Sequence, residues 1–158
     1  MQMSSPVRQL TLNSFQLRDS DPVVEIREQV DKNKLPFILG LIDVNDTFNV
    51  GTAFRLADAM GVKELILFGK TECPPNPRID KASVGTHKWV NWKYVNNVNT
   101  YIDQFRIENP EYKIIAVEQS SASISIYNSN LHFPVLLLLG NETAGIDDAI
   151  LQRCERYE

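Results

Sequence analysis

The sequence contains few of the residues from which metal centres and disulfide frameworks are built. Its 158 residues include two cysteines, Cys73 and Cys154, and two histidines, His87 and His132. The cysteines lie far apart and form no Cys-x-x-Cys pair, which excludes a disulfide scaffold and argues against a zinc site. We therefore expect no metal, and we expect both thiols to be reduced in a cytoplasmic protein.

Long apolar runs and an excess of positive charge are also absent. No apolar stretch approaches the roughly 18–20 residues of a membrane span. The N-terminus, MQMSSPVRQL, lacks the apolar core of a secretory signal, so we expect no membrane partner. The net charge of −4 argues against nucleic-acid binding through overall charge, although a local basic patch would still allow it. A hydrophobic content of 43% fits one globular domain.

Apolar and amphipathic segments alternate along most of the chain. Strands are expected at 37–44, 62–68, 90–95, 112–117 and 135–139, and helices at 52–60, 80–86, 98–107 and 146–154. Runs that are apolar throughout, such as Val135 to Leu139, are typical of strands buried on both faces of a parallel sheet. The pattern predicts an α/β fold, with a mostly parallel sheet and helices on both faces.

The two ends of the chain differ from this central region. Residues 1–35 are expected to form an N-terminal arm and a helix that begins at Asp21 and Pro22, while residues 36–158 form the domain. Three prolines predict an irregular loop over 71–79. Residues 153–158 have the pattern that leads into a further strand.

The first polar segment that attracts attention follows the strand at 37–44. Gly51 is expected to let the backbone turn into the following helix. Asn49 offers a donor and an acceptor at the end of the strand, and Arg55 can hold a phosphate with two hydrogen bonds. The alternative is that this segment is only a turn and that Arg55 is a solvated helix charge.

A second polar segment, Gly140 to Gly145, follows the strand at 135–139. We expect Gly140 to let a ligand approach closely, and Asn141 or Thr143 to cap the next helix. Glu142 is favoured near a helix N-terminus, and capping alone is the alternative role of this segment. Open α/β sheets bind ligands beyond the carboxyl ends of their strands, so both segments are candidate sites. Neither segment is a Walker loop or a Gly-x-Gly-x-x-Gly fingerprint.

Together the two segments resemble the signature motifs of SpoU-type RNA ribose methyltransferases, which belong to the α/β-knot (SPOUT) class. The similarity rests on Asn49-x-Gly51-x-x-x-Arg55, on Leu139-Gly140-Asn141-Glu142-x-x-Gly145, and on Lys81-x-Ser83-x-Gly85. It implies a knotted, parallel-sheet homodimer that uses S-adenosylmethionine to methylate a ribose 2′-hydroxyl in tRNA or rRNA.

The resemblance also implies roles for individual residues. Arg55 would act on the 2′-hydroxyl, and we favour a holding role because a guanidinium keeps its proton in proteins. Asn49 would orient Arg55 or the ribose, and Glu142 would fix the arginine. The cofactor's adenosine would lie against the backbone at four residues: Val117, Glu118, Leu139 and Gly140.

Arg78 and Lys81 would contact substrate RNA as part of a basic rim that also includes Lys88 and Lys93. The alternative is that these are scattered, solvated charges.

The family's third motif, an Ile-Pro segment followed by Ser-x-Asn and a final helix, would begin just after Glu158 and is absent from this sequence. We favour the interpretation that the C-terminal knot segment is missing because the chain is part of a longer protein. The alternative is a catalytically silent RNA-binding module of the same fold. A flavodoxin-like nucleotide-binding domain is a third reading.

Overall fold

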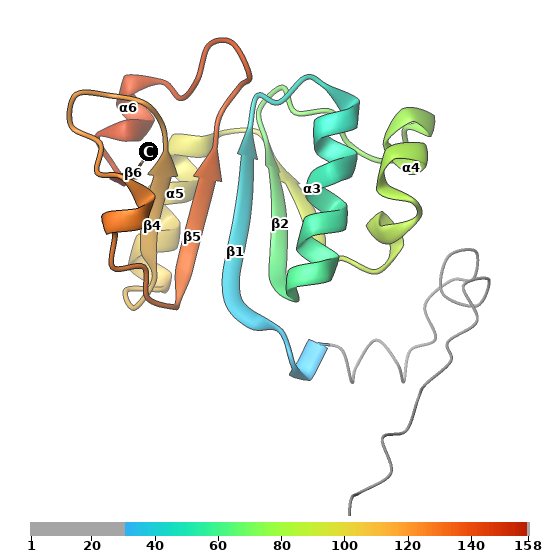
Figure 1. The fold of residues 1–158 in the computed structure, drawn as a ribbon, viewed down its shortest axis with the longest axis horizontal. Helices are drawn as coiled ribbons and strands as arrows, with labels where there is room; N and C mark the ends of the chain where they lie inside the picture. The colour runs from blue at the N-terminus through green and yellow to red at the C-terminus, as the bar shows by residue number, and fades with distance from the viewer. Residues whose placement is uncertain (1–30, 158) are drawn as a thin grey trace, which may run out of the picture.

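The computed structural model describes residues 31–157, which form a six-stranded parallel sheet with helices packed against it (Figure 1). The strands are β1 (Leu35–Ile42), β2 (Val62–Phe68), β3 (Trp92–Val95), β4 (Lys113–Val117), β5 (Val135–Leu139) and β6 (Glu155–Tyr157). The helices are α3 (Thr47–Met60), α4 (Pro77–Ser83), α5 (Val98–Glu108) and α6 (Asp148–Leu151), with 3-10 turns η1 (Thr86–Lys88) and η2 (Ile126–Asn128). The N-terminal arm and the start of the helix expected at Asp21 lie outside the described residues.

The order of the strands across the sheet is β3-β2-β1-β5-β4-β6, and every neighbouring pair is parallel. The chain runs outward from β1 through β2 to β3, then crosses to β4 and returns to β5 beside β1. The direction of winding therefore changes between β1 and β5, where Leu41 pairs with Leu139. Ligands of open α/β sheets bind in the crevice outside the carboxyl ends of the strands at this switch point.

The side chains of β1 alternate between two apolar layers, as in a strand covered on both faces. Phe37, Leu39 and Leu41 pack in the layer that contains α3, whereas Ile38 and Ile42 pack in the layer that contains α5 and α6. Helices on opposite faces of the sheet are visible in Figure 1. This arrangement confirms the predicted α/β fold. Within residues 31–157, no helix combines the length and apolarity that crossing a membrane requires.

Helix α3 begins five residues earlier than expected, at Thr47. Asp46 caps it by accepting the Phe48 N–H at 2.8 Å, so Asn49 and Gly51 lie within the helix and not in a turn before it. The expected role of Gly51 as a turn residue is wrong. A Cβ at Gly51 would lie 2.4 Å from the Ala82 Cβ, so the glycine allows α3 and α4 to pack closely.

Two other helices also differ from the expectation because of their caps. Helix α4 begins at Pro77, inside the segment expected to be irregular, because Asn76 is its N-cap and proline suits the first helical position. Helix α6 is one turn long and begins only after Asp147, its N-cap. The strand expected from 153–158 is present as β6, which pairs with β4.

Gly51→Ala should destabilise the protein by about 1–3 kcal/mol, because the added methyl group overpacks the contact between α3 and α4. At an open helix position the same change would stabilise by roughly 1 kcal/mol. Urea unfolding measures the difference. Adding Ala82→Gly should restore part of the loss, and a single Gly51→Ala variant as stable as the parent would contradict the packing role.

Candidate functional site

The turn after β5 is held to the end of β1 by the side chain of Asn141. Its Nδ2 donates to the Asp43 carbonyl oxygen at 2.7 Å, and its Oδ1 accepts the N–H groups of Thr143 and Ala144 at 2.9 and 2.8 Å. The backbone of Asn141 also exchanges two hydrogen bonds with Gly145. Asn141 therefore closes its own turn and fastens that turn to the neighbouring strand.

The end of β4 is joined to the same turn through the carboxylate of Glu118. Its Oε2 accepts the Ile146 N–H at 2.7 Å, and its Oε1 accepts the Gln119 N–H at 2.9 Å. Gly145 has a positive φ of 68°, and a Cβ there would lie 2.3 Å from Glu118 Oε2. Glu118 thus fixes the turn from the opposite side to Asn141.

This turn brings Glu142 to the N-terminus of α3. Asn49 Nδ2 donates to Glu142 Oε1 at 2.9 Å, across 93 positions of sequence. This hydrogen bond is the main reason why the pKa of Glu142 is lowered, and nearby backbone N–H groups, that of Glu142 itself first, lower the pKa further. The two polar segments identified in the sequence therefore meet, through Asn49 and Glu142.

Arg55 does not take part in this contact. It is exposed and, among residues 31–157, it forms no ion pair with Glu142 or with any other carboxylate. Arg55 follows Asn49 by six positions in the helix, which places the two residues about 9 Å apart along the axis and about 120° apart around it. The expected contact between Arg55 and Glu142 is absent from the described chain. Arg55 instead shares a side of α3 with exposed Phe48, seven residues earlier.

The four residues expected to line a cofactor lie at the carboxyl ends of β4 and β5. Val117 pairs with Leu139 in register, so their main-chain groups reach the same edge of the sheet. A Cβ on Gly140 would lie 2.5 Å from Ile146 Cγ1, which shows that the turn, and not an open space for a ligand, lies beside this glycine. The space that a side chain at Gly140 would need is filled by the turn, and close approach of a ligand to its backbone stays a prediction. The four residues can bind a cofactor through their main-chain groups. The Glu118 carboxylate already accepts the N–H groups of Gln119 and Ile146.

Arg78 and Lys81 both lie on α4 and are exposed. The helix is tied to η1 by His87, whose Nδ1 lies 2.9 Å from Ser83 Oγ and whose Nε2 lies 3.3 Å from Asp80 Oδ1. The order Asp–His–Ser is that of a hydrolase triad, but Ser83 is fully buried and no substrate can reach its hydroxyl. The contacts of His87 with Asp80 and Ser83 therefore hold α4 in place, and α4 carries Arg78 and Lys81.

Sequence reasoning missed the part played by Asp43. The residue has a positive φ of 55°, and its Oδ1 accepts the Lys70 N–H at 2.7 Å. Aspartate tolerates this left-handed conformation better than most residues, so an Asp directly after an apolar strand was an available signal. The strand was expected to continue to Val44, and it ends at Ile42.

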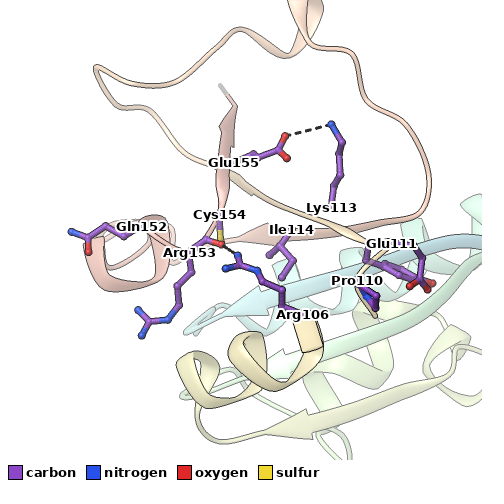
Figure 2. A pocket seen from close by; sticks show the side chains of 10 residues that line it. Arg106, Pro110, Glu111, Lys113, Ile114, Gln152, Arg153, Cys154 and Glu155 are labelled. Carbon is purple, nitrogen blue, oxygen red and sulfur yellow. Dashed lines mark hydrogen bonds and ion pairs between the residues drawn. The ribbon is translucent and has the colours of Figure 1, made fainter. Parts of the chain in front are cut away.

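A cleft of about 550 Å³ lies beside the first residues of β4 and β6, at the other end of these strands from the Asn49–Glu142 contact (Figure 2). Four of its charged groups have partners: Lys113 Nζ lies 3.7 Å from a Glu155 carboxylate oxygen, Arg153 Nε lies 3.0 Å from Asp103 Oδ1, and Arg106 donates to the Arg153 carbonyl. The cleft is at the amino ends of its strands. It is therefore not part of the site formed by Asn49 and Glu142.

Asn49→Ala should raise the pKa of Glu142 toward its ordinary value, because the largest stabilisation of the carboxylate is lost. In the parent protein the contact is intact above the ordinary pKa and is lost as the pH falls through the lowered one. Side-chain carboxylate titration by NMR measures the change. Asn45→Ala is the control, because it keeps the backbone N–H, and an unchanged pKa in Asn49→Ala would contradict the assignment.

Comparison with known proteins gives a consistent result. Residues 36–157 match the SpoU rRNA Methylase family. Over 125 residues the chain is 27% identical to a 23S rRNA (guanosine-2′-O-)-methyltransferase of Blochmanniella floridana, covering 78% of this chain and 48% of that protein. The chain spans about half the length of the first curated relatives it matches.

Solved structures agree with the fold. A putative RNA methyltransferase of the TrmH family from Porphyromonas gingivalis superposes with a TM-score of 0.70 at 25% identity, covering 78% of this chain and 49% of that one. An AdoMet-bound rRNA methyltransferase from Sinorhizobium meliloti superposes with a TM-score of 0.65 at 24% identity, covering 82% and 51%.

The matched region begins one residue after the start of β1, includes both polar segments and ends with β6. The chain therefore belongs to the SpoU rRNA methylase family, in the SPOUT class of RNA 2′-O-methyltransferases.

Proposed function

We propose that the protein containing this chain transfers a methyl group from S-adenosylmethionine to a ribose 2′-hydroxyl of tRNA or rRNA. The observation that carries the proposal is the Asn49–Glu142 contact, which joins the two polar segments at the switch point of the sheet. Family membership and the named activities of its relatives support this function. We assign the catalytic domain to residues 36–158, with residues 1–35 as an N-terminal arm, and we place the reaction in the cytoplasm.

When bound, S-adenosylmethionine would supply an electrophilic methyl group to the 2′-oxygen, whose proton would pass to water, with a neutral thioether as the leaving group. The main-chain groups of Val117, Glu118, Leu139 and Gly140 hold the adenosine in this proposal. Uncharged main-chain groups suit a reaction that depends mainly on alignment of the oxygen with the methyl carbon. No metal enters the proposal, and among residues 31–157 no cluster of His, Cys, Asp or Glu could hold one.

Four side chains would act on the RNA: Asn49, Arg55, Arg78 and Lys81. Glu142 and Asn49 hold each other in place, so that Asn49 presents a fixed amide to the ribose. The Arg55 guanidinium is exposed and binds the phosphate or the hydroxyl of the incoming nucleotide, keeping its proton throughout. Arg78 and Lys81 contact the RNA backbone from α4.

Arg55→Ala should lower methyl transfer to RNA by about 100-fold or more, because loss of a positioning group misaligns the reacting atoms. Transfer of labelled methyl groups from S-adenosylmethionine to RNA measures the effect. Arg106→Ala, at the remote cleft of Figure 2, is the matched control and should retain activity. Unchanged activity in Arg55→Ala, with an intact fold by circular dichroism, would remove Arg55 from the mechanism.

A catalytically silent RNA-binding module is the competing function. Calorimetric titration of the parent protein with S-adenosylmethionine separates the two functions, because a silent module binds RNA without binding the methyl donor. Saturable binding of the donor supports the enzyme. RNA binding with no detectable heat from the donor would overturn the proposed activity.

We also propose that the protein forms a homodimer through α3. Five large apolar side chains are exposed on α3 and on the segment before β5, and we call them the α3 patch: Phe48, Leu56, Met60, Leu131 and Phe133. Phe48 is 67% exposed, and Met60, Leu131 and Phe133 line one apolar cleft together. Exposed apolar surface of this kind is typical of interaction sites.

Leu56→Glu should raise the dimer dissociation constant by about tenfold or more, because a buried unpaired charge costs over 1.4 kcal/mol. Sedimentation equilibrium measures the constant. Ile107→Glu is the matched control, since Ile107 is 81% exposed on α5, on the other face of the sheet. Equal effects of the two changes, or a monomeric parent protein, would contradict the proposed interface.

A further inference from the structure

The turn after β5 is anchored to both neighbouring strands. In the sheet β5 lies between β1 and β4, so the turn that follows it could tilt toward either one (Figure 1). On the β1 side, Asn141 Nδ2 donates to the Asp43 carbonyl. On the β4 side, the carboxylate of Glu118 accepts the Ile146 N–H at 2.7 Å. The position of the turn is therefore set by side-chain anchors on both sides.

The anchor on the β4 side is a carboxylate that binds main-chain groups. Glu118 Oε2 accepts the Ile146 N–H, and Oε1 accepts the Gln119 N–H at 2.9 Å. Within residues 31–157, no ion pair includes Glu118. Hydrogen bonds to an ionised acceptor are roughly twice as strong as those between neutral groups, and a carboxylate offers an oxygen to each of the two donors. A neutral side chain of the same length would replace at most one of these bonds.

Gly145 provides both the backbone conformation and the space that this carboxylate needs. Its φ of 68° lies in the left-handed region, which favours glycine. A Cβ at this position would lie 2.3 Å from Glu118 Oε2. Any other residue here would therefore displace the carboxylate from the Ile146 N–H.

The anchor is not needed to close the turn. The backbones of Asn141 and Gly145 exchange hydrogen bonds of 3.1 and 3.0 Å, and Asn141 Oδ1 accepts two further N–H groups of the turn. This closed turn carries Glu142 to Asn49 on α3, the helix that follows β1. What Glu118 adds is the orientation of a turn that is already closed, and with it the approach of Glu142 to α3.

We propose that Glu118 is a positioning residue for methyl transfer, which acts through Glu142 on the amide of Asn49. The inference rests on the proposed function, because it takes methyl transfer as the reaction that Glu118 serves. The main chain of Glu118 is also where we place the adenosine of the donor. One residue thereby relates the donor to the amide that faces the ribose. Such alignment matters because a misplacement of about 1 Å can slow an enzyme by roughly 100-fold.

The first test is titration of the Glu142 carboxylate by NMR, in the protein without donor or RNA. Glu118→Ala should raise the pKa of Glu142 toward its ordinary value, because a tilted turn weakens the hydrogen bond from Asn49 that lowers this pKa. Glu118→Gln keeps the length of the side chain and one acceptor oxygen, and it should cause a smaller rise.

Ser123→Ala is the matched control for this titration. Ser123 Oγ donates to the main-chain carbonyl of Glu118 at 2.6 Å, so its loss disturbs the same residue without removing the carboxylate. The pKa of Glu142 should stay unchanged in Ser123→Ala. A rise equal to that in Glu118→Ala would show a general disturbance of the segment and would overturn the proposal.

A double-mutant cycle tests whether Glu118 acts through Asn49. In an Asn49→Ala background, Glu118→Ala should move the Glu142 pKa by less than about half the shift that it causes alone, because the bond it weakens is already lost. Equal shifts in both backgrounds would overturn the proposal. So would an unchanged pKa in Glu118→Ala with an intact fold by circular dichroism. If neither Glu118 variant folds, the carboxylate serves stability and the proposal is likewise overturned.

Methyl-transfer kinetics supply the second test. Glu118→Ala should lower kcat by about tenfold or more and change the KM for RNA by less than about twofold, because alignment is lost while the RNA contacts remain. Transfer that Glu118→Ala leaves unchanged would count against the inference alone. The titration needs no methyl donor, so a raised Glu142 pKa in a protein without any transfer activity would count against the proposed function.

Discussion

The rest of the site depends on the hydrogen bonds of the Asn141 carboxamide. Its two ends serve different partners: Nδ2 donates to the Asp43 carbonyl at the end of β1, while Oδ1 accepts two N–H groups of its own turn. The strands joined in this way are neighbours in the sheet but lie 98 residues apart in the chain. Without this link the turn would lose its side-chain contact with β1 and would be held from the β4 side alone, by Glu118.

The N-terminus of α3 then attracts two carboxylates from different parts of the chain. Asp46 caps the helix from within its own segment, and Glu142 approaches from the turn after β5. Free N–H groups and the helix dipole favour negative charge at this position. The pKa of Glu142 is lowered mainly by the hydrogen bond from the Asn49 side chain. A site arranged by such fixed donors is formed before any ligand arrives, as proposed catalysis by alignment requires.

The two sides of α3 have different surroundings, and this separates the proposed roles of its residues. Asn49 faces the turn after β5, and Leu56 and Met60 of the α3 patch lie on the same side of the helix, whereas Arg55 lies with Phe48 about 120° away around the axis. The close packing of Gly51 against α4 sets the position of both sides relative to the proline-rich segment. One helix thereby relates the strand-end site and the Arg55 guanidinium to each other.

The sequence by itself determined the parallel sheet, the strand of Val135 to Leu139 and the two polar segments, because apolar runs and glycine-punctuated turns are local signals. It did not determine where α3 begins, since the choice between Asp46 and a later cap depends on packing against α4. Nor did it determine that Asn49, and not Arg55, contacts Glu142. That pairing depends on the order β2-β1-β5-β4 and on the rotation of side chains about α3, which arise only when distant segments are brought together in the folded sheet.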